Sequence, residues 1–215
     1  MIGDKLTYHS NYQNITNYVI AELKENLISK KRICISVSGE SGCGKTSLAY
    51  ALQQDIEKTT GLKGAFFHQD DYFKLPPAAN HNARLKDISV VGMNEVNLEL
   101  LNDHLIQFQS KKNILDKPLV NYHQNIILNE HITSNNFDFC IVEGTYVSSL
   151  KAADYRIFIK TTYLDTRKSR IKRARDIIND FNEQVLEIEH QIISGQKSMA
   201  DIIIDKNLKL TKTKH

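Results

Sequence analysis

Residues 35–52, ISVSGESGCGKTSLAYAL, constrain the fold of this chain more than any other stretch. Residues that favour buried strands come first, glycines follow, and helix-forming residues come last. This order predicts a strand, a tight turn and a helix in direct succession. Such units build parallel sheets covered by helices, so the stretch predicts an α/β fold.

The turn has the spacing G-x-x-x-x-G-K-[ST] of the phosphate-binding P-loop. Glycines let the backbone curl so that its N–H groups face phosphate oxygens, and the next helix adds its positive N-terminal end. We expect Lys45 to reach the outer phosphates, Thr46 to bind Mg²⁺ and Cys43 to use its N–H, not its thiol. The expected nucleotide-binding residues of the loop are Gly39, Glu40, Ser41, Gly42, Cys43, Gly44, Lys45, Thr46 and Ser47.

The rest of the chain alternates apolar strand patterns with amphipathic helix patterns. Strands are expected over residues 31–39, 65–70, 137–144, 155–161 and 201–205, and helices over 12–30, 47–64, 95–112 and 165–194. A hairpin is expected over 118–132 with Gln124 and Asn125 at its turn, a loop over 72–87, and partial order after residue 205. This alternation predicts a parallel sheet with helices on both faces.

Composition excludes few functions. The 215 residues suffice for one sizeable core, so a single domain over 1–215 is expected, with 1–31 as an N-terminal helical extension. A net charge of +3 gives no reason to expect a nucleic-acid partner, and the apolar runs are too short for a membrane span. No secretory signal is visible, and Cys34, Cys43 and Cys140 suit reduced thiols without a zinc site, which favours a cytoplasmic protein.

Two acidic features follow expected strands. Asp70 and Asp71 stand where the second strand enters a loop, and Glu143 ends the strand at 137–144. In an open α/β sheet this edge faces the ligand crevice. A carboxylate there can take the proton of a substrate hydroxyl or help hold a metal ion, so Thr46, Glu143 and Asp70 are the expected Mg²⁺ ligands. An ordinary strand-ending turn and a helix cap are the alternatives.

The segments SGESGCGKTSLA, HQDDYFK and IVEGTYV together resemble the uridine kinase and phosphoribulokinase family of P-loop kinases over about residues 33 to 205. A GTPase would show N-K-x-D and an ABC-type ATPase a segment like L-S-G-G-Q, and neither is present. The resemblance implies ATP and Mg²⁺ as cofactors, Asp70 as the catalytic base and Lys45 as a catalytic residue.

Residues 167–175 contain six basic side chains, which suit a nucleic-acid surface, a solvated helix face or a lid that closes arginines over the transferring phosphate. The resemblance favours a lid within residues 165–195. It implies Arg170 and Arg173 as catalytic residues and Arg175 as an ATP contact, in a register that stays open. The family's second arginine pair is replaced by INDFNEQ, so fewer cationic contacts are expected, or contacts from elsewhere.

The acceptor is expected against residues 72–77, 86–97 and 118–125. The resemblance implies substrate contacts from Asp70, Tyr72, Phe73, Tyr122 and His123, whereas Asn94, Glu95 and Asn97 replace the family's aspartates. It implies ATP-dependent phosphorylation of a nucleoside 5′-hydroxyl, uridine first and cytidine next. Nicotinamide riboside or pantothenate as acceptor, and a nucleotide-binding regulator or nucleic-acid-associated ATPase, are the alternatives. Uridine kinases often form tetramers, so homo-oligomerisation stays open.

Overall fold

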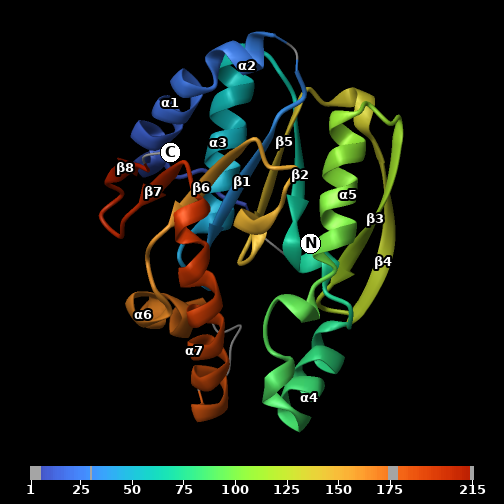
Figure 1. Ribbon diagram of the computed structural model, residues 1–215, viewed down its shortest axis with the longest axis vertical. Coiled ribbons are helices and arrows are strands. Elements are labelled where there is room, and N and C mark those ends of the chain that lie inside the picture. The colour runs from blue at the N-terminus through green and yellow to red at the C-terminus, as the bar shows by residue number, and fades with distance from the viewer. Residues whose placement is uncertain (1–5, 30, 174–178, 214–215) are drawn as a thin grey trace.

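The fold is organised around a mostly parallel sheet (Figure 1), seen in a computed structural model that describes residues 6–29, 31–173 and 179–213. Within these residues the sheet has six strands, in the spatial order β2 (Gly64–His68), β5 (Phe139–Gly144), β1 (Cys34–Gly39), β6 (Tyr155–Ile159), β7 (Ile202–Ile204) and β8 (Leu210–Lys212). Neighbours are parallel except β7 and β8, which are antiparallel. The predicted α/β class with a parallel sheet is confirmed.

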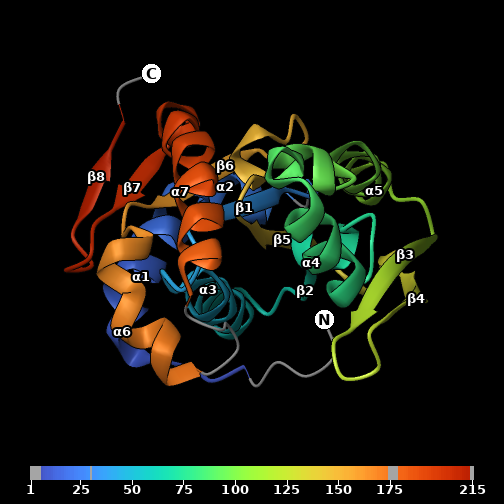
Figure 2. The same cartoon turned by 90° about the horizontal axis from the view of Figure 1, so that it is seen from below.

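Helices cover both faces of the sheet, as predicted (Figure 2). On one face α1 (Gln13–Glu22), α2 (Lys24–Ile28) and α3 (Lys45–Thr60) pack on alternate residues of β1 such as Ile35 and Val37. On the other face α5 (Leu98–Gln109) and the end of α7 (Asp180–Gly195) pack on residues such as Cys34. Each strand therefore feeds two cores, which explains its unbroken apolar sequence.

The N-terminal segment is attached to this sheet domain. The predicted helix over 12–30 is divided at Leu23 into α1 and α2, and it is preceded by a short 3₁₀ helix, η1 (Ser10–Tyr12). Ile15 and Val19 are buried against α3, and the Thr16 hydroxyl donates to Asp55 of α3 at 2.5 Å. Lys212 of β8 also lies 2.7 Å from Glu22.

The strand order places the phosphate loop at the centre of the molecule. β1 lies between β5 and β6, and it leads through residues 40–44 into α3. The chain leaves β1 towards β2 on one side and reaches β6 on the other, so the carboxyl end of β1 is a topological switch point. Ligands bind at such points because neighbouring loops diverge there.

The expected loop over 72–87 is wrong in part, because α4 (Pro77–Lys86) is a helix. Pro77 occupies its first turn, where proline's fixed φ suits a helix and its missing N–H costs nothing. No residue of α4 is buried, so this helix does not need the apolar stripe that predicts a helix from sequence. The 3₁₀ helices η3 (Ile88–Val90) and η4 (Met93–Glu95) follow it.

The remaining elements agree with the predictions except at the C-terminus. The hairpin is present as β3 (Ile114–Asn121) and β4 (Ile126–Thr133), with Gln124 and Asn125 in the turn. The helical region expected over 165–194 consists of two helices, α6 (Tyr163–Arg173) and α7. Residues 210–212, expected to be partly ordered, form β8. The other 3₁₀ helices are η2 (Gln69–Tyr72), η5 (Ser134–Asn136), η6 (Val147–Ser149) and η7 (Gln196–Met199). Among the described residues, no helix has the length and apolar character to span a bilayer.

Candidate active site

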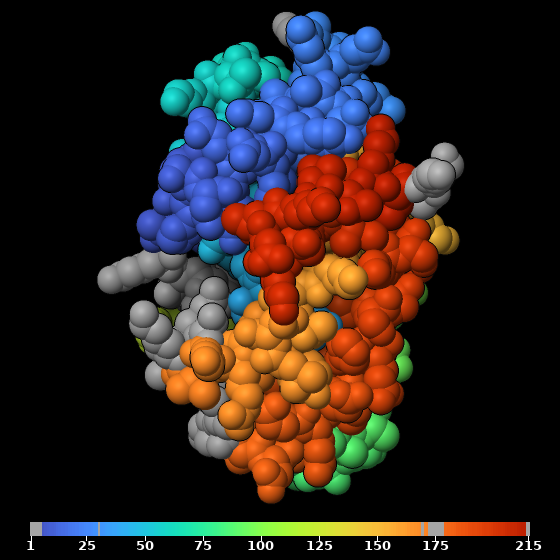
Figure 3. Space-filling model, turned by 90° about the vertical axis from the view of Figure 1, so that its left-hand side faces the viewer, coloured from blue at the N-terminus to red at the C-terminus, as the bar shows by residue number. Residues whose placement is uncertain are grey.

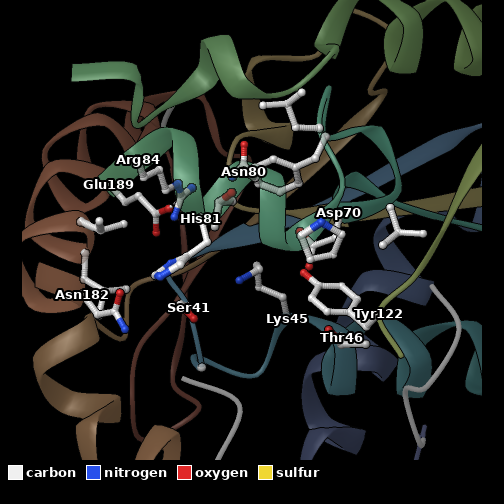
Figure 4. Close-up of a pocket in the computed structure, with 18 of the residues that line it drawn as sticks. Ser41, Lys45, Thr46, Asp70, Asn80, His81, Arg84, Tyr122, Asn182 and Glu189 are labelled. Atoms are coloured by element: carbon white, nitrogen blue, oxygen red, sulfur yellow. Dashed lines mark hydrogen bonds and ion pairs between the residues drawn. The ribbon is translucent and has the colours of Figure 1, made fainter. Parts of the chain in front are cut away.

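A cleft of about 500 Å³ lies at the carboxyl ends of the central strands (Figure 4). Its floor is the phosphate loop and the start of α3, including Lys45 and Thr46. Helices α4 and α7 extend beyond the sheet as two arms and supply its walls (Figure 1). The hairpin β3–β4 and the segment after β2 close the remaining side. The cleft therefore joins residues from distant parts of the chain.

The phosphate loop has the backbone shape that its glycines allow. Gly44 precedes α3 with φ of 100°, a conformation that residues with a Cβ rarely adopt. The Lys45 ammonium donates to the Glu40 carbonyl at 2.9 Å, and thus lies over the loop. Ser41, Gly42, Lys45 and Thr46 line the cleft. Lys45 can exchange its carbonyl partner for phosphate oxygens, as a P-loop lysine must.

Asp70 and Glu143 both line the cleft, and their surroundings shift their pKa values in opposite directions. Burial and the Glu143 charge raise the pKa of Asp70 to about 6. Burial alone would raise the pKa of Glu143, but the His68 hydrogen bond at 2.8 Å and the charges of His68 and Lys45 lower it. Pairs of acids whose pKa values are driven apart are suited to different tasks, a proton acceptor and a permanent anion.

The ends of β2 and β5 are locked together beside these acids. The Gln69 amide donates to Thr145 at 2.8 Å and accepts from the Tyr146 N–H at 2.7 Å. A Cβ on Gly144 would lie 2.3 Å from the Gln69 Cβ, so the residue after Glu143 must be glycine. This packing fixes the spacing between the strand ends that carry Asp70 and Glu143.

The residues present fit an Mg²⁺ ion bound together with nucleotide phosphates. Mg²⁺ takes oxygen ligands, and proteins hold it through one or two carboxylates plus substrate phosphates and water. Thr46, Asp70 and Glu143 line the same cleft, and Thr46 hydrogen-bonds Glu143. The lowered pKa of Glu143 keeps it ionised at neutral pH. Among the described residues no group of three or more His, Cys, Asp or Glu side chains is placed to hold a metal ion.

Asp71 holds the hairpin against the cleft. It is fully buried and accepts from the Val120 N–H at 2.9 Å and from Lys117 at 3.1 Å. Lys117 also lies 2.8 Å from Glu130 on β4. The Asp71 carboxylate thus joins η2, which carries Asp70, to the strand that leads to Tyr122. Of the two adjacent aspartates, one faces the cleft and the other anchors its wall.

Helix α6 begins on the phosphate loop. The Glu40 carboxylate accepts from the Tyr163 N–H at 2.6 Å, and the Thr166 hydroxyl donates to the Ser41 carbonyl at 3.0 Å. Arg170 is buried beside Gly42, where a Cβ would lie 2.9 Å from the Arg170 Cγ. Its Nε has no hydrogen-bond partner among the described residues. An unpaired buried guanidinium nitrogen beside a phosphate loop is a donor that phosphate oxygens can satisfy.

The other lid arginines cannot be placed. Arg173 ends α6, but its side chain lies outside the described part of the structure, and so does Arg175 entirely. Ser47 belongs to the first turn of α3 and is half-buried. Gly42 and Cys43 line a second pocket on the other side of the loop.

A charged network that the sequence did not reveal forms the far end of the cleft. Arg84 of α4 contacts Glu95 at 2.5 Å and Glu189 of α7 at 3.1 Å, and Asn80 donates to Glu95 at 2.9 Å. Figure 4 shows Arg84 and Glu189 on one side of Lys45, with Asp70 and Tyr122 on the other. Burial raises the pKa of Glu189, and the charge of Arg84 opposes the rise. Arg84 is thus shared by two carboxylates, Glu95 and Glu189.

The predicted acceptor residues divide into two groups. Phe73 and Tyr122 line the cleft together with Asp70. Tyr72 is buried in the core, where its hydroxyl pairs with His104 at 2.9 Å, and His123 is exposed in the hairpin turn outside the cleft. The structure does not bring Tyr72 or His123 to the cleft, and our proposals assign them no substrate contact.

Two of the three residues that replace the family's aspartates make structural contacts within the protein. Glu95 accepts from the Gly92 N–H at 2.8 Å and pairs with Arg84, and Asn97 caps α5 through the Leu100 N–H at 3.2 Å. Asn94 is exposed. Of the three, Glu95 contacts the cleft wall, through Arg84.

The sheet order, the phosphate loop at its centre and the paired strand-end carboxylates define a P-loop kinase. The model of the phosphoribulokinase / uridine kinase family matches residues 34–209, and the chain belongs to this family.

Individual relatives are distant. The uridine kinase of Streptococcus thermophilus is 27% identical over 194 residues, which cover 85% of this chain and 90% of the relative. The bifunctional alpha-galactosidase/sucrose kinase AgaSK of Mediterraneibacter gnavus is 26% identical over 193 residues, which cover 83% of this chain but 20% of that protein, so this chain spans about a fifth of its length. The phosphoribulokinase structure from Rhodobacter spheroides superposes with a TM-score of 0.62 at 16% identity, covering 82% of this chain and 70% of that one. The last likeness shows the fold alone.

Proposed function

We propose that this protein is an Mg²⁺- and ATP-dependent kinase that phosphorylates the 5′-hydroxyl of a nucleoside, uridine first and cytidine next, in the cytoplasm. The observation that carries the proposal is the position of Asp70, whose carboxylate shares one cleft with Lys45, Thr46 and Glu143. A kinase needs a proton acceptor within reach of the phosphate loop, and a carboxylate with a pKa of about 6 is ionised at neutral pH yet basic enough for the task.

The polar groups around the phosphate loop then divide the work of the reaction. Backbone N–H groups of residues 39–44 and the Lys45 ammonium bind the donor phosphates, and Asp70 accepts the proton of the acceptor hydroxyl. Thr46 and Glu143, with Asp70 nearby, would hold Mg²⁺, which neutralises charge on the phosphates. The unpaired Nε of Arg170 offers a further donor to the phosphoryl group. Arg173 and Arg175 stay proposed lid contacts.

The acceptor end of the cleft supports an uncharged alcohol. Arg84 is already paired with two carboxylates, Glu95 and Glu189. Their negative charges compensate its positive charge, so it attracts an anionic acceptor only weakly. Phe73 and Tyr122 offer aromatic surface for a pyrimidine ring. Among the alternative acceptors, pantothenate is an anion and fits this end poorly, whereas the cationic nicotinamide riboside suits it.

A nucleic-acid-associated ATPase is a weaker proposal. Two of the basic side chains of α6 are engaged within the protein, since Arg170 is buried and Arg167 lies 3.7 Å from Glu183. Such an ATPase would bind RNA with a steep salt dependence and form no phosphorylated small product. Homo-oligomerisation stays open within our proposal.

A panel of acceptors in an ADP-release assay tests the acceptor. We expect uridine and cytidine to be the fastest, nicotinamide riboside slower, and pantothenate inactive. Turnover of a non-nucleoside alone would contradict the proposed acceptor and leave the kinase chemistry standing.

A further inference from the structure

A second pocket of about 530 Å³ opens on the other side of the phosphate loop from the cleft. Gly42 lines both pockets, whereas Asp70 and Glu143 line only the cleft. A donor nucleotide held by this loop must direct its terminal phosphate towards Asp70. Its sugar and base must then leave the loop on the opposite side, which is where the second pocket lies.

The walls of the second pocket suit a flat heteroaromatic ring with polar atoms at its edge. Ile159, Ile204 and Leu208 supply apolar surface, and Asp165 and Asn207 stand among the polar residues of its rim. Binding sites for small heteroaromatic groups combine apolar walls with a few polar contacts in this way. The pocket can therefore accept a base and its ribose.

The N-terminal segment forms part of this pocket. Asn11 and Tyr12, from the short helix η1, are among its lining residues. A Cβ on Gly44 would meet the Tyr12 hydroxyl at 2.6 Å, so the Tyr12 side chain lies directly against the phosphate loop. Both residues precede the family match, which begins at residue 34, so family membership does not account for them.

The segment is held in place by contacts outside the pocket. The Tyr8 hydroxyl donates to Asp55 at 3.0 Å, and Thr16 donates to the same carboxylate at 2.5 Å. Figure 3 shows the N-terminal segment, the C-terminal strands and α6 meeting on one face of the molecule. Tyr12 is thus a fixed part of the pocket wall, between two anchored points of the chain.

We propose that Asn11 and Tyr12 of the N-terminal segment complete the base and ribose pocket of the donor nucleotide, with Tyr12 as a binding residue. This inference rests on the proposed function, because it needs a nucleotide whose phosphates occupy the loop. It assigns a ligand contact to a part of the chain that lies outside the family match.

Calorimetric binding of two probes, ATP and inorganic tripolyphosphate, tests the inference. Tripolyphosphate carries the phosphates without the base and ribose. Loss of an aromatic contact with a base costs about 1–3 kcal/mol, so Tyr12→Ala should weaken ATP binding about 5- to 150-fold. It should change tripolyphosphate binding less than about twofold, and Tyr12→Phe should stay near wild type because it keeps the ring.

Tyr8→Ala is the matched control, since Tyr8 anchors the same segment but lines neither pocket. It should bind ATP nearly as wild type does, because Thr16 still bonds the segment to Asp55. Equal losses in Tyr8→Ala and Tyr12→Ala, equal weakening of both probes, or unchanged ATP binding in Tyr12→Ala would each overturn the inference. If Tyr12→Ala does not fold, Tyr12→Leu keeps the apolar bulk without the flat ring and carries the same expectation.

The controls also separate this inference from the proposed function. If the wild-type protein binds tripolyphosphate as tightly as ATP, the base and ribose contribute no affinity, and only the proposed pocket is overturned. A wild-type protein that binds neither probe would overturn the donor role of the loop, and the pocket with it.

Discussion

The Nδ1 atom of His190 on α7 lies 2.7 Å from Oε1 of Glu40 in the phosphate loop. The other oxygen of the same carboxylate accepts the Tyr163 N–H that begins α6. One side chain of the loop therefore contacts both helices that follow β6. Because Glu189 stands next to His190 and faces the cleft, this contact links the phosphate loop to the acceptor wall.

His190→Ala should loosen α7 and raise the KM for the acceptor. A partly buried hydrogen bond of this kind contributes about 0.5–1.5 kcal/mol, which corresponds to about 2- to 10-fold in KM. Steady-state kinetics with each substrate varied would measure it. Gln191→Ala, the exposed neighbour on α7, should leave both KM values unchanged. An acceptor KM that does not move in His190→Ala would contradict the link.

Asp70→Asn should lower kcat about 10²- to 10⁴-fold, the usual contribution of a positioned general base. ATP affinity should stay within about twofold, because the loop and Lys45 are untouched. Asp71→Asn is the informative neighbour, since its buried carboxylate anchors the hairpin, so it should lower the free energy of unfolding instead. Normal turnover in Asp70→Asn would contradict the assignment of the base.

Glu143→Gln should raise the Mg²⁺ concentration required for half-maximal activity at least tenfold. The lowered pKa of Glu143 means that it supplies a full negative charge at neutral pH, which glutamine removes. A chelator should abolish activity in both proteins, and added Mg²⁺ should restore wild type first. Identical Mg²⁺ titrations would exclude Glu143 from the metal site.

Glu189 lines the cleft, and we expect its carboxylate to accept a charge-assisted hydrogen bond from an acceptor hydroxyl. Glu189→Gln should therefore raise the KM for uridine about 10- to 100-fold. The KM for ATP should not change. Removing this charge also releases Arg84 in part, so discrimination against an anionic acceptor such as pantothenate should weaken. Glu187→Gln, on the same helix, keeps an acceptor for the Tyr163 hydroxyl and should behave as wild type. Equal acceptor KM values in the two variants would contradict this role.

Tyr72→Phe should lower the free energy of unfolding by about 1 kcal/mol and leave the acceptor KM unchanged, because the hydroxyl pairs with His104 in the core. Burial and the charges of Lys112 and Lys117 lower the pKa of His104 below its usual 6.5. The folded state therefore favours neutral His104, so its contribution is complete above pH 6.5 and is lost as the pH falls below it. Urea unfolding at pH 8 and pH 5.5 measures both effects on stability. A raised acceptor KM in Tyr72→Phe would instead indicate that Tyr72 contacts the substrate.

The sequence predicts the parts of the site that belong to continuous strand-to-loop motifs. The phosphate loop, Asp70 and Glu143 each follow a buried strand, and parallel strands bring their carboxyl ends to one edge. Their meeting in one cleft follows from topology alone.

The acceptor wall could not be predicted in the same way. Arg84 and Glu189 are separated by 105 residues, and nothing local marks them as partners. Helix α4, which carries Arg84, buries no residue. Its sequence therefore needs no apolar stripe, the pattern by which the other helices are predicted. Tyr12 was hidden for a similar reason, because its approach to Gly44 depends on how α1 packs against α3.

The most direct test of the account is the identity of the product formed from uridine and Mg²⁺-ATP, followed by ³¹P NMR and mass spectrometry. We predict stoichiometric formation of uridine 5′-monophosphate and ADP, which Asp70→Asn slows by orders of magnitude. Release of inorganic phosphate without any phosphorylated nucleoside, from uridine or from cytidine, would contradict the central claim.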